Sequence, residues 1–189
     1  MRVSEFCGLT KRDIDFKRHR IHVNHQLAHR YDGSYYVEKP KSERENRYIP
    51  MTDEVYKSVV NIISNRQNVK TEILVDGYSG FLLLTNNERL RVSSHIASSI
   101  RLAMKKYAKL HPDNPLSHIT PHVFRHTFCT NTANAGMSVK TLQYLMGHSN
   151  VVITLNVYTH TSYEHVAEQM AKIVDIKSVS KQGKIDDAM

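Results

Sequence analysis

The sequence predicts an α+β fold that is mainly helical and carries one small three-stranded antiparallel sheet. Two observations predict this class: extended segments are confined to the first third of the chain, and amphipathic helical patterns fill the remainder. Helix start and stop residues such as Thr120-Pro121 and Gly136 delimit those patterns. A length of 189 residues suffices for one domain with its own core.

The chain opens on a helix that lacks a start signal. Residues 2–9 have the apolar pattern of the middle and end of a helix, with Gly8 near its C-terminal end. No capping residue precedes this pattern, so we expect the chain to be N-terminally truncated. The catalytic domain is then expected to span residues 1–174, and a polar tail over 175–189 is either mobile or docked on a neighbouring protomer.

The predicted sheet follows this first helix. Turn residues separate its strands: Asp32-Gly33 forms the first turn, and a basic second turn contains Lys39, Pro40, Lys41 and Ser42. The three extended segments lie at about residues 19–28, 34–38 and 46–51.

Helices are predicted for most of the remaining chain. Thr52 caps the first, which places Val55, Val59, Val60 and Ile63 on one side. After a loop at 66–80 and a short hairpin through Asn86-Asn87, a long amphipathic helix starts at Ser93 or Ser94. Its buried stripe is predicted to contain Ile96, Ile100, Ala103, Met104 and Tyr107.

Three further helices carry clear end signals. Thr120-Pro121 starts one that runs to Ala135 and stops at Gly136. Ser138 caps a short helix that ends at Gly147. The last starts at Thr161 with Glu164 placed for a capping box, and it is predicted to bury Val166, Met170 and Ile173.

The charge balance indicates an anionic partner. Lysine and arginine number 26 against 18 acidic residues, which gives a net charge of +8 and a pI near 9.5. DNA or RNA is the usual partner of such a chain, although a basic surface without a partner has the same composition. Two distant cysteines, Cys7 and Cys129, make no disulfide framework and indicate a reducing cytosol. The most apolar run, residues 81–84, is too short to cross a membrane.

Four residues near the C-terminus carry the chemistry. His122 and Arg125 lie three apart in the first turns of a helix, where both side chains share a face and free N–H groups favour an anion. His148 follows the chain-reversing Gly147, and Tyr158 supplies a phenol with an ordinary pKa near 10. Each residue taken alone is more often structural than catalytic. Together they could bind a phosphate and attack it.

The order of these motifs resembles a known family. The strings HxxRHT from His122, GHS from Gly147 and YTH from Tyr158 are similar to the second conserved box of the tyrosine recombinases, the phage integrase family. Residues 2–10 followed by 13–15 resemble the first box, and Lys41 resembles the lysine of the family's sheet. The resemblance covers nearly the whole chain. Residues 24–27 and 50–55 are most similar to integrases of Gram-positive conjugative transposons.

The resemblance implies a fold, an activity and six catalytic residues. The fold is the tyrosine-recombinase catalytic domain, and the activity is site-specific recombination through a 3′-phosphotyrosine, without metal, ATP or cofactor. Tyr158 is the implied nucleophile, and Glu5 is implied to orient Arg2. The other implied catalytic residues are Arg2 and Arg125 on the phosphate oxygens, Lys41 as general acid, His122 in proton transfer and His148 as a hydrogen-bond donor to the phosphate.

The same resemblance implies partners and a location. Double-stranded DNA is the expected substrate, the full-length protein is expected to form a homo-tetramer on it, and a directionality factor can take part. The expected location is the bacterial cytoplasm, on the nucleoid when DNA is bound, with no membrane. Truncation predicts weak, salt-sensitive DNA binding by this chain.

Three other interpretations remain. His122 and His126 have a metal-binding spacing, but HExxH and CxxC motifs are absent and Arg125 opposes a dication, so no metal site is predicted. The short helices around Gly136 and Gly147 could form the helix-turn-helix of a non-catalytic DNA-binding remnant or regulator. A type IB topoisomerase has a similar set of catalytic residues.

Overall fold

The computed structural model describes residues 1–40, 46–66, 69–158, 167 and 170–171. Helices and small antiparallel sheets share this part of the chain, which confirms the predicted α+β class. The predicted helix from Thr161 lies largely outside the described residues, and Lys41 and the tail 175–189 lie wholly outside them. No helix within the described ranges is long and apolar enough to cross a membrane.

The first helix, α1 (Val3–Gly8), has a start signal that the sequence prediction missed. Glu5 Oε2 accepts a hydrogen bond of 2.6 Å from the backbone N–H of Arg2, the residue before the helix. The acidic residue in the first turn thus satisfies an N–H group that the helix itself leaves unpaired. The helix therefore begins at Val3, and the expectation that residues 2–9 form only the middle and end of a helix was wrong.

The predicted sheet is two sheets. A three-stranded antiparallel sheet has the order β1 (Ile14–Asp15), β2 (Arg20–Val23) and β5 (Arg47–Pro50). A separate antiparallel pair consists of β3 (Gln26–His29) and β4 (Tyr35–Glu38).

The segment predicted as one strand at 19–28 therefore breaks between β2 and β3. Buried His25 stands at the break, and its Nε2 lies 2.7 Å from the carbonyl oxygen of Gly8 at the end of α1. Gly8 lies so close to β3 that a Cβ there would be 2.9 Å from the nitrogen of Leu27. This contact with α1 draws β3 out of the first sheet.

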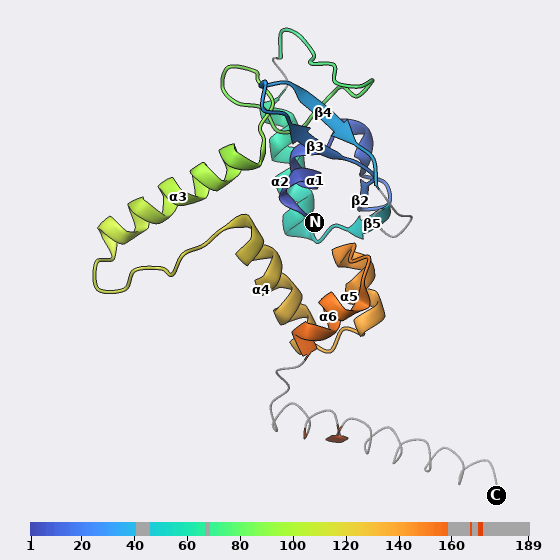
Figure 1. Ribbon diagram of the computed structural model, residues 1–189, viewed down its shortest axis with the longest axis vertical. Coiled ribbons are helices and arrows are strands. Elements are labelled where there is room, and N and C mark those ends of the chain that lie inside the picture. Colours follow the sequence, from blue (N-terminus) through green and yellow to red (C-terminus); the bar gives the residue numbers. More distant parts are fainter. Residues whose placement is uncertain (41–45, 67–68, 159–166, 168–169, 172–189) are drawn as a thin grey trace, which may run out of the picture.

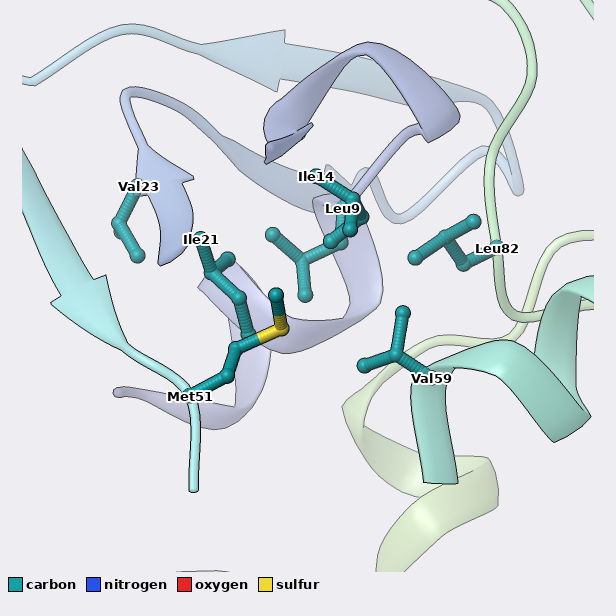
Figure 2. Close-up of a cluster of buried hydrophobic side chains, with 7 residues drawn as sticks. All are labelled: Leu9, Ile14, Ile21, Val23, Met51, Val59 and Leu82. Carbon is teal, nitrogen blue, oxygen red and sulfur yellow. The ribbon is translucent and has the colours of Figure 1, made fainter. Parts of the chain in front are cut away.

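One side of the three-stranded sheet forms the main core. Figure 2 shows its side chains converging from strands β1 and β2, from α2 (Asp53–Asn65), and from residues that follow α1 and β5. Burying each aliphatic side chain of this size contributes about 1.5–3 kcal/mol. The buried members are Leu9, Ile14, Ile21, Val23, Met51, Val59 and Leu82.

Helix α2 starts after Thr52, as predicted, and the Thr52 hydroxyl accepts from the N–H of Val55. Its buried side is narrower than the sequence pattern indicated. Val59 is buried, whereas Val55 and Val60 are each 39% exposed.

Helix α3 (Ser93–Leu110) begins where predicted but buries no residue within the described structure. Figure 1 shows it extending away from the rest of the molecule, and Leu102 and Leu110 are 60% and 76% exposed. Through Ile96, its first turn packs against a second cluster of buried residues, which consists of Cys7, Leu27, Val75, Phe81, Leu90 and Val92. The predicted buried stripe is thus only half-buried, and Ala103 is exposed.

The C-terminal helices form a third group with a small core of its own. Helices α4 (Pro121–Asn134) and α5 (Val139–Met146) have the predicted bounds within one residue, and the Thr120 and Ser138 hydroxyls cap them. Helix α6 (Val151–Tyr158) was not predicted. Figure 1 shows α4, α5 and α6 together, with α5 next to β5 and the N-terminus. Their core contains Cys129, Ala133, Leu142 and Met146.

Candidate active site

Three arginines from three parts of the chain meet at the C-terminal turn of α5. Each donates a hydrogen bond to a different carbonyl oxygen of this turn, where a helix leaves its acceptors unpaired and its dipole is negative. We call Arg2, Arg47 and Arg125 the arginine cluster. Their bonds run from Arg47 Nε to Leu145 O (3.0 Å), from Arg125 Nη2 to Met146 O and from Arg2 Nη2 to Gly147 O (3.0 Å).

Glu5 is the carboxylate inside this cluster. Its Oε1 lies 3.1 Å from Arg2 Nη1, and its two oxygens accept from both terminal nitrogens of Arg47 at 3.2 and 3.0 Å. Burial would raise the pKa of Glu5, but the hydrogen bond and charge of Arg47, and then those of Arg2, lower it below its ordinary value. One carboxylate charge therefore opposes three guanidinium charges, and the cluster keeps a net positive charge.

Arg125 has an unused donor. Its Nη1 is buried and has no hydrogen-bond partner among the described residues. Burial lowers the pKa of Arg125 to about 10; Glu5 opposes this shift, and the charges of Arg2 and Arg47 add to it. The guanidinium thus remains charged at neutral pH. A buried donor without a partner is costly, and an anionic oxygen placed there would satisfy it.

His148 follows the last carbonyl of the turn and is neutral. Burial lowers its pKa to about 4, and the nearby charges of Arg125, Arg2 and Arg47 add to this shift. Its Nδ1 lies 2.9 Å from the hydroxyl of Thr154, a fully buried residue of α6. The imidazole therefore cannot carry the second proton at neutral pH, but it can donate one hydrogen bond.

His122 and His126 lie on successive turns of α4 and contact each other. Their Nε2 atoms are 2.7 Å apart, the rings are nearly perpendicular and both side chains are exposed. One nitrogen of the pair donates and the other accepts. No cluster of three or more histidine, cysteine or acidic residues suited to a metal occurs in the described ranges.

Tyr158 lies away from the arginine cluster. Its hydroxyl donates a hydrogen bond of 2.6 Å to the carbonyl oxygen of Met137, which follows the end of α4 and precedes α5. Arg125 lies near the opposite end of α4, about 13 Å along the axis at 1.5 Å per residue. Burial, and then the nearby Cys129, raises the pKa of Tyr158. The phenol is thus protonated and turned away from the site.

A cavity of about 240 Å³ adjoins the arginine cluster. It lies between α1 and the β3–β4 pair, and Arg2 and Glu5 line the side nearest the cluster. Gln26 and Glu38 line its far wall, joined by a hydrogen bond of 2.6 Å. Lys39 and Pro40, immediately before position 41 in the sequence, also line the cavity.

The structure thus brings together three of the six predicted site residues, Arg2, Arg125 and His148. His122 lies one turn before Arg125 on α4, Tyr158 lies apart, and Lys41 is outside the described residues. Arg47 was not predicted. Strand alternation could have indicated it, because Arg47 shares a face with Ile49, which packs against the core.

Comparison with known proteins places the chain in a family. The phage integrase family model matches residues 1–165. The chain is 42% identical to the Tn916 transposase of Enterococcus faecalis over 173 residues, 92% of this chain but 42% of that protein. It is 29% identical to the tyrosine recombinase XerC of Thermodesulfovibrio yellowstonii, covering 89% of this chain and 48% of that one.

Solved structures agree with the sequence comparison. The Tn1549 transposon integrase in complex with transposon right-end DNA superposes with a TM-score of 0.84 at 41% identity, over 92% of this chain and 55% of that one. The XerA recombinase superposes with a TM-score of 0.65 at 26% identity, over 90% of this chain and 51% of that one. The chain thus spans about half the length of its relatives. It belongs to the phage integrase family, the tyrosine recombinases.

Proposed function

We propose that this chain is the catalytic part of a mobile-element integrase that cuts and rejoins DNA through a 3′-phosphotyrosine. The observation that carries the proposal is the convergence of Arg2, Arg125 and His148 at one turn, where Arg125 has a buried donor without a partner among the described residues. Such a site is complementary to a phosphate. Family membership supports the same activity.

The phosphate would bind against the arginine cluster. Arg2 and Arg125 would donate to its non-bridging oxygens and stabilise the charge that grows on them in the pentavalent transition state. His148, neutral at physiological pH, would donate the third hydrogen bond. Because Glu5 already fixes Arg2, little reorganisation is needed when DNA binds.

The nucleophile would have to move before it can react. In the proposed step the Tyr158 oxygen bonds to phosphorus, its proton passes to His122, and the bond from phosphorus to the 5′-oxygen breaks. Lys41 would give its proton to the departing 5′-oxygen. This role is supported by the cavity beside Arg2, because Lys39 and Pro40, the two residues before position 41 in the sequence, line it.

The expected partners follow from this activity. Double-stranded DNA is the proposed substrate, consistent with the net charge of +8 and with the DNA complexes of the Tn1549 integrase. We also propose a homo-tetramer on DNA for the full-length protein, a directionality factor for its control, and the bacterial cytoplasm as its location.

A nicked suicide substrate tests the proposal. The chain is expected to form a covalent protein–DNA adduct that Tyr158→Phe abolishes while DNA binding persists. A chain that binds DNA but never forms the adduct would be a DNA-binding remnant. An adduct that survives in Tyr158→Phe would place the nucleophile elsewhere.

A second substrate tests the general acid. A 5′-bridging phosphorothiolate has a leaving group that needs no proton, so it should restore most of the cleavage lost in Lys41→Ala. Cleavage that stays slow with this substrate would remove Lys41 from the proposed step. Arg125→Ala is the control, because the phosphorothiolate cannot replace a donor to the non-bridging oxygens.

A further inference from the structure

Arg47 is the most buried member of the arginine cluster. Only 1% of the residue is exposed, and it opens strand β5. Its Nε donates to Leu145 O, and its Nη1 and Nη2 both donate to the carboxylate of Glu5. These bonds occupy all three nitrogens of a side chain that lies below the surface, so a phosphate bound outside cannot reach it.

The two partners of Arg47 each lead to a different part of the phosphate site. Glu5 also holds Arg2, whose Nη2 donates to the carbonyl of Gly147. Leu145 lies in the last turn of α5, which is followed by Gly147 and His148. Arg47 thereby joins α1 to the end of α5, in addition to the bond from Arg2 to Gly147.

Gly147 shows how tightly the turn lies on this guanidinium. A Cβ at position 147 would stand 2.6 Å from Arg47 Nη1 and 2.7 Å from its Cζ. The residue also has φ +63°, a conformation that glycine adopts without strain. The turn before His148 therefore packs directly on Arg47.

A second contact joins β5 to α5. The backbone N–H of Tyr48, the residue after Arg47, donates a hydrogen bond of 3.0 Å to the hydroxyl of Tyr144 on α5. Strand β5 and α5 are thus joined at adjacent residues. The contact orients the strand so that the Arg47 side chain points beneath the turn.

We propose that Arg47 is a positioning residue for strand cleavage: it holds Arg2 through Glu5, and His148 through the end of α5, without touching DNA. The proposal rests on the proposed function. In this proposal Arg47 acts only through Arg2 and His148, which donate to the non-bridging oxygens of the phosphate. Arg47 is also the first residue of β5 and lies six positions after Lys41 in the sequence. The alternative to exclude is therefore that Arg47 acts through Lys41 on the leaving 5′-oxygen.

Another buried arginine provides a matched control. Arg66 is 7% exposed and is bound in the same manner, by a backbone carbonyl, that of Phe81, and by both oxygens of Glu72. None of the described contacts of Arg66 reaches the arginine cluster. If burial of an arginine matters only for folding, Arg47→Met and Arg66→Met should behave alike.

Single-turnover cleavage of a pre-bound suicide substrate is the first test. Arg47→Met is expected to slow cleavage about 100-fold, the cost of displacing a catalytic group by about 1 Å, while Arg66→Met cleaves like the wild type per folded molecule. Arg47→Lys, which cannot form the bidentate contact, should fall between them. A 5′-bridging phosphorothiolate should not restore Arg47→Met. Equal rates for the two methionine variants, or restoration by the phosphorothiolate, would overturn the proposal.

An NMR titration of His148 tests the proposal without cleavage. Its signal is identified by its absence in His148→Gln. In Arg47→Lys, which keeps the positive charge, the pKa of His148 should rise from about 4 toward its ordinary 6.5 because the turn loosens. Arg47→Met also removes a nearby charge that lowers this pKa, so it should raise the pKa further, whereas Arg66→Met should leave it unchanged. An unchanged titration in a folded Arg47 variant would contradict the proposal. If the wild type forms no adduct but the titration changes as expected, the proposed function fails and the positioning role stands.

Discussion

The two ends of α5 differ in how far they are prepared for chemistry. At the C-terminal end, Arg2, Arg47 and Arg125 already bind the last carbonyls and leave a buried donor for a phosphate oxygen. At the N-terminal end, Tyr158 bonds to the carbonyl of Met137. The site that would bind the phosphate is assembled, whereas the group that would attack it is held elsewhere.

This difference separates binding from reaction. Releasing Tyr158 requires breaking its hydrogen bond to Met137 O, which contributes about 1 kcal/mol net, and moving Val157 and Tyr158 off the small core of α4 and α5. A few new contacts to DNA could supply that energy. A protein built this way would bind DNA before its nucleophile is in place, so it would not attack phosphates it meets by chance.

The largest expected effect on cleavage comes from a substitution at the C-terminal end of α5, which we call the assembled end; the N-terminal end, where Tyr158 bonds to Met137 O, is the held end. Arg125→Met should slow cleavage of a pre-bound suicide substrate about 10²–10³-fold, as loss of a charge-stabilising donor does elsewhere. Its thermal stability should change little, because the lost hydrogen bond to Met146 O and the lost attraction to Glu5 are offset when a buried donor without a partner and the repulsion from Arg2 and Arg47 are removed. A stability loss as large as the activity loss would show that Arg125 is mainly structural.

Gly147→Ala should be the next largest change. The new Cβ would overlap Arg47 Nη1, and the positive φ adds strain, so we expect a loss of about 2–3 kcal/mol in urea unfolding. Gly33→Ala is the matched control, since Gly33 has φ +86° but nothing within 4 Å of its Cβ position. Equal losses at the two sites would mean that Arg47 yields to the added methyl group.

The neutral state of His148 predicts a pH effect. Its pKa is about 4 when folded and 6.5 otherwise, so the unfolded chain binds more protons between those values and stability must fall as pH drops from 6.5 to 4. After allowance for its partial exposure, His148 should account for about 1–2 kcal/mol of this loss. His148→Gln should flatten the curve of unfolding free energy against pH by that amount. Parallel curves for the two proteins would refute the lowered pKa.

The smallest effect is at the held end. Tyr158→Phe should cost about 1 kcal/mol of stability by removing the bond to Met137 O, although it is expected to abolish the adduct. Tyr31→Phe, at a fully exposed tyrosine, should cost nothing measurable in the same denaturation experiment. A Tyr158→Phe protein as stable as the wild type would mean that the hydroxyl is not held in solution.

The assembled end was largely predictable from sequence and the held end was not. Helical spacing placed His122 and Arg125 on one face, and Gly147 predicted the turn before His148. Arg47 was missed because its burial depends on α1 and α5, which approach it from residues 42 and 98 positions away. The partner of Tyr158 was equally invisible, since α6 has no amphipathic pattern to predict how it packs. The break at His25 was missed because its cause is a contact with Gly8.

A fluorine NMR measurement on 3-fluorotyrosine at position 158 tests the account most directly. In the free protein we expect one resonance from a phenol bonded to Met137 O, and on addition of the suicide substrate that resonance should move before or together with adduct formation. An adduct that forms while the remaining uncleaved complex keeps the resonance of the free protein unchanged would show that Tyr158 already faces the phosphate. That result would contradict the division of α5 into an assembled end and a held end.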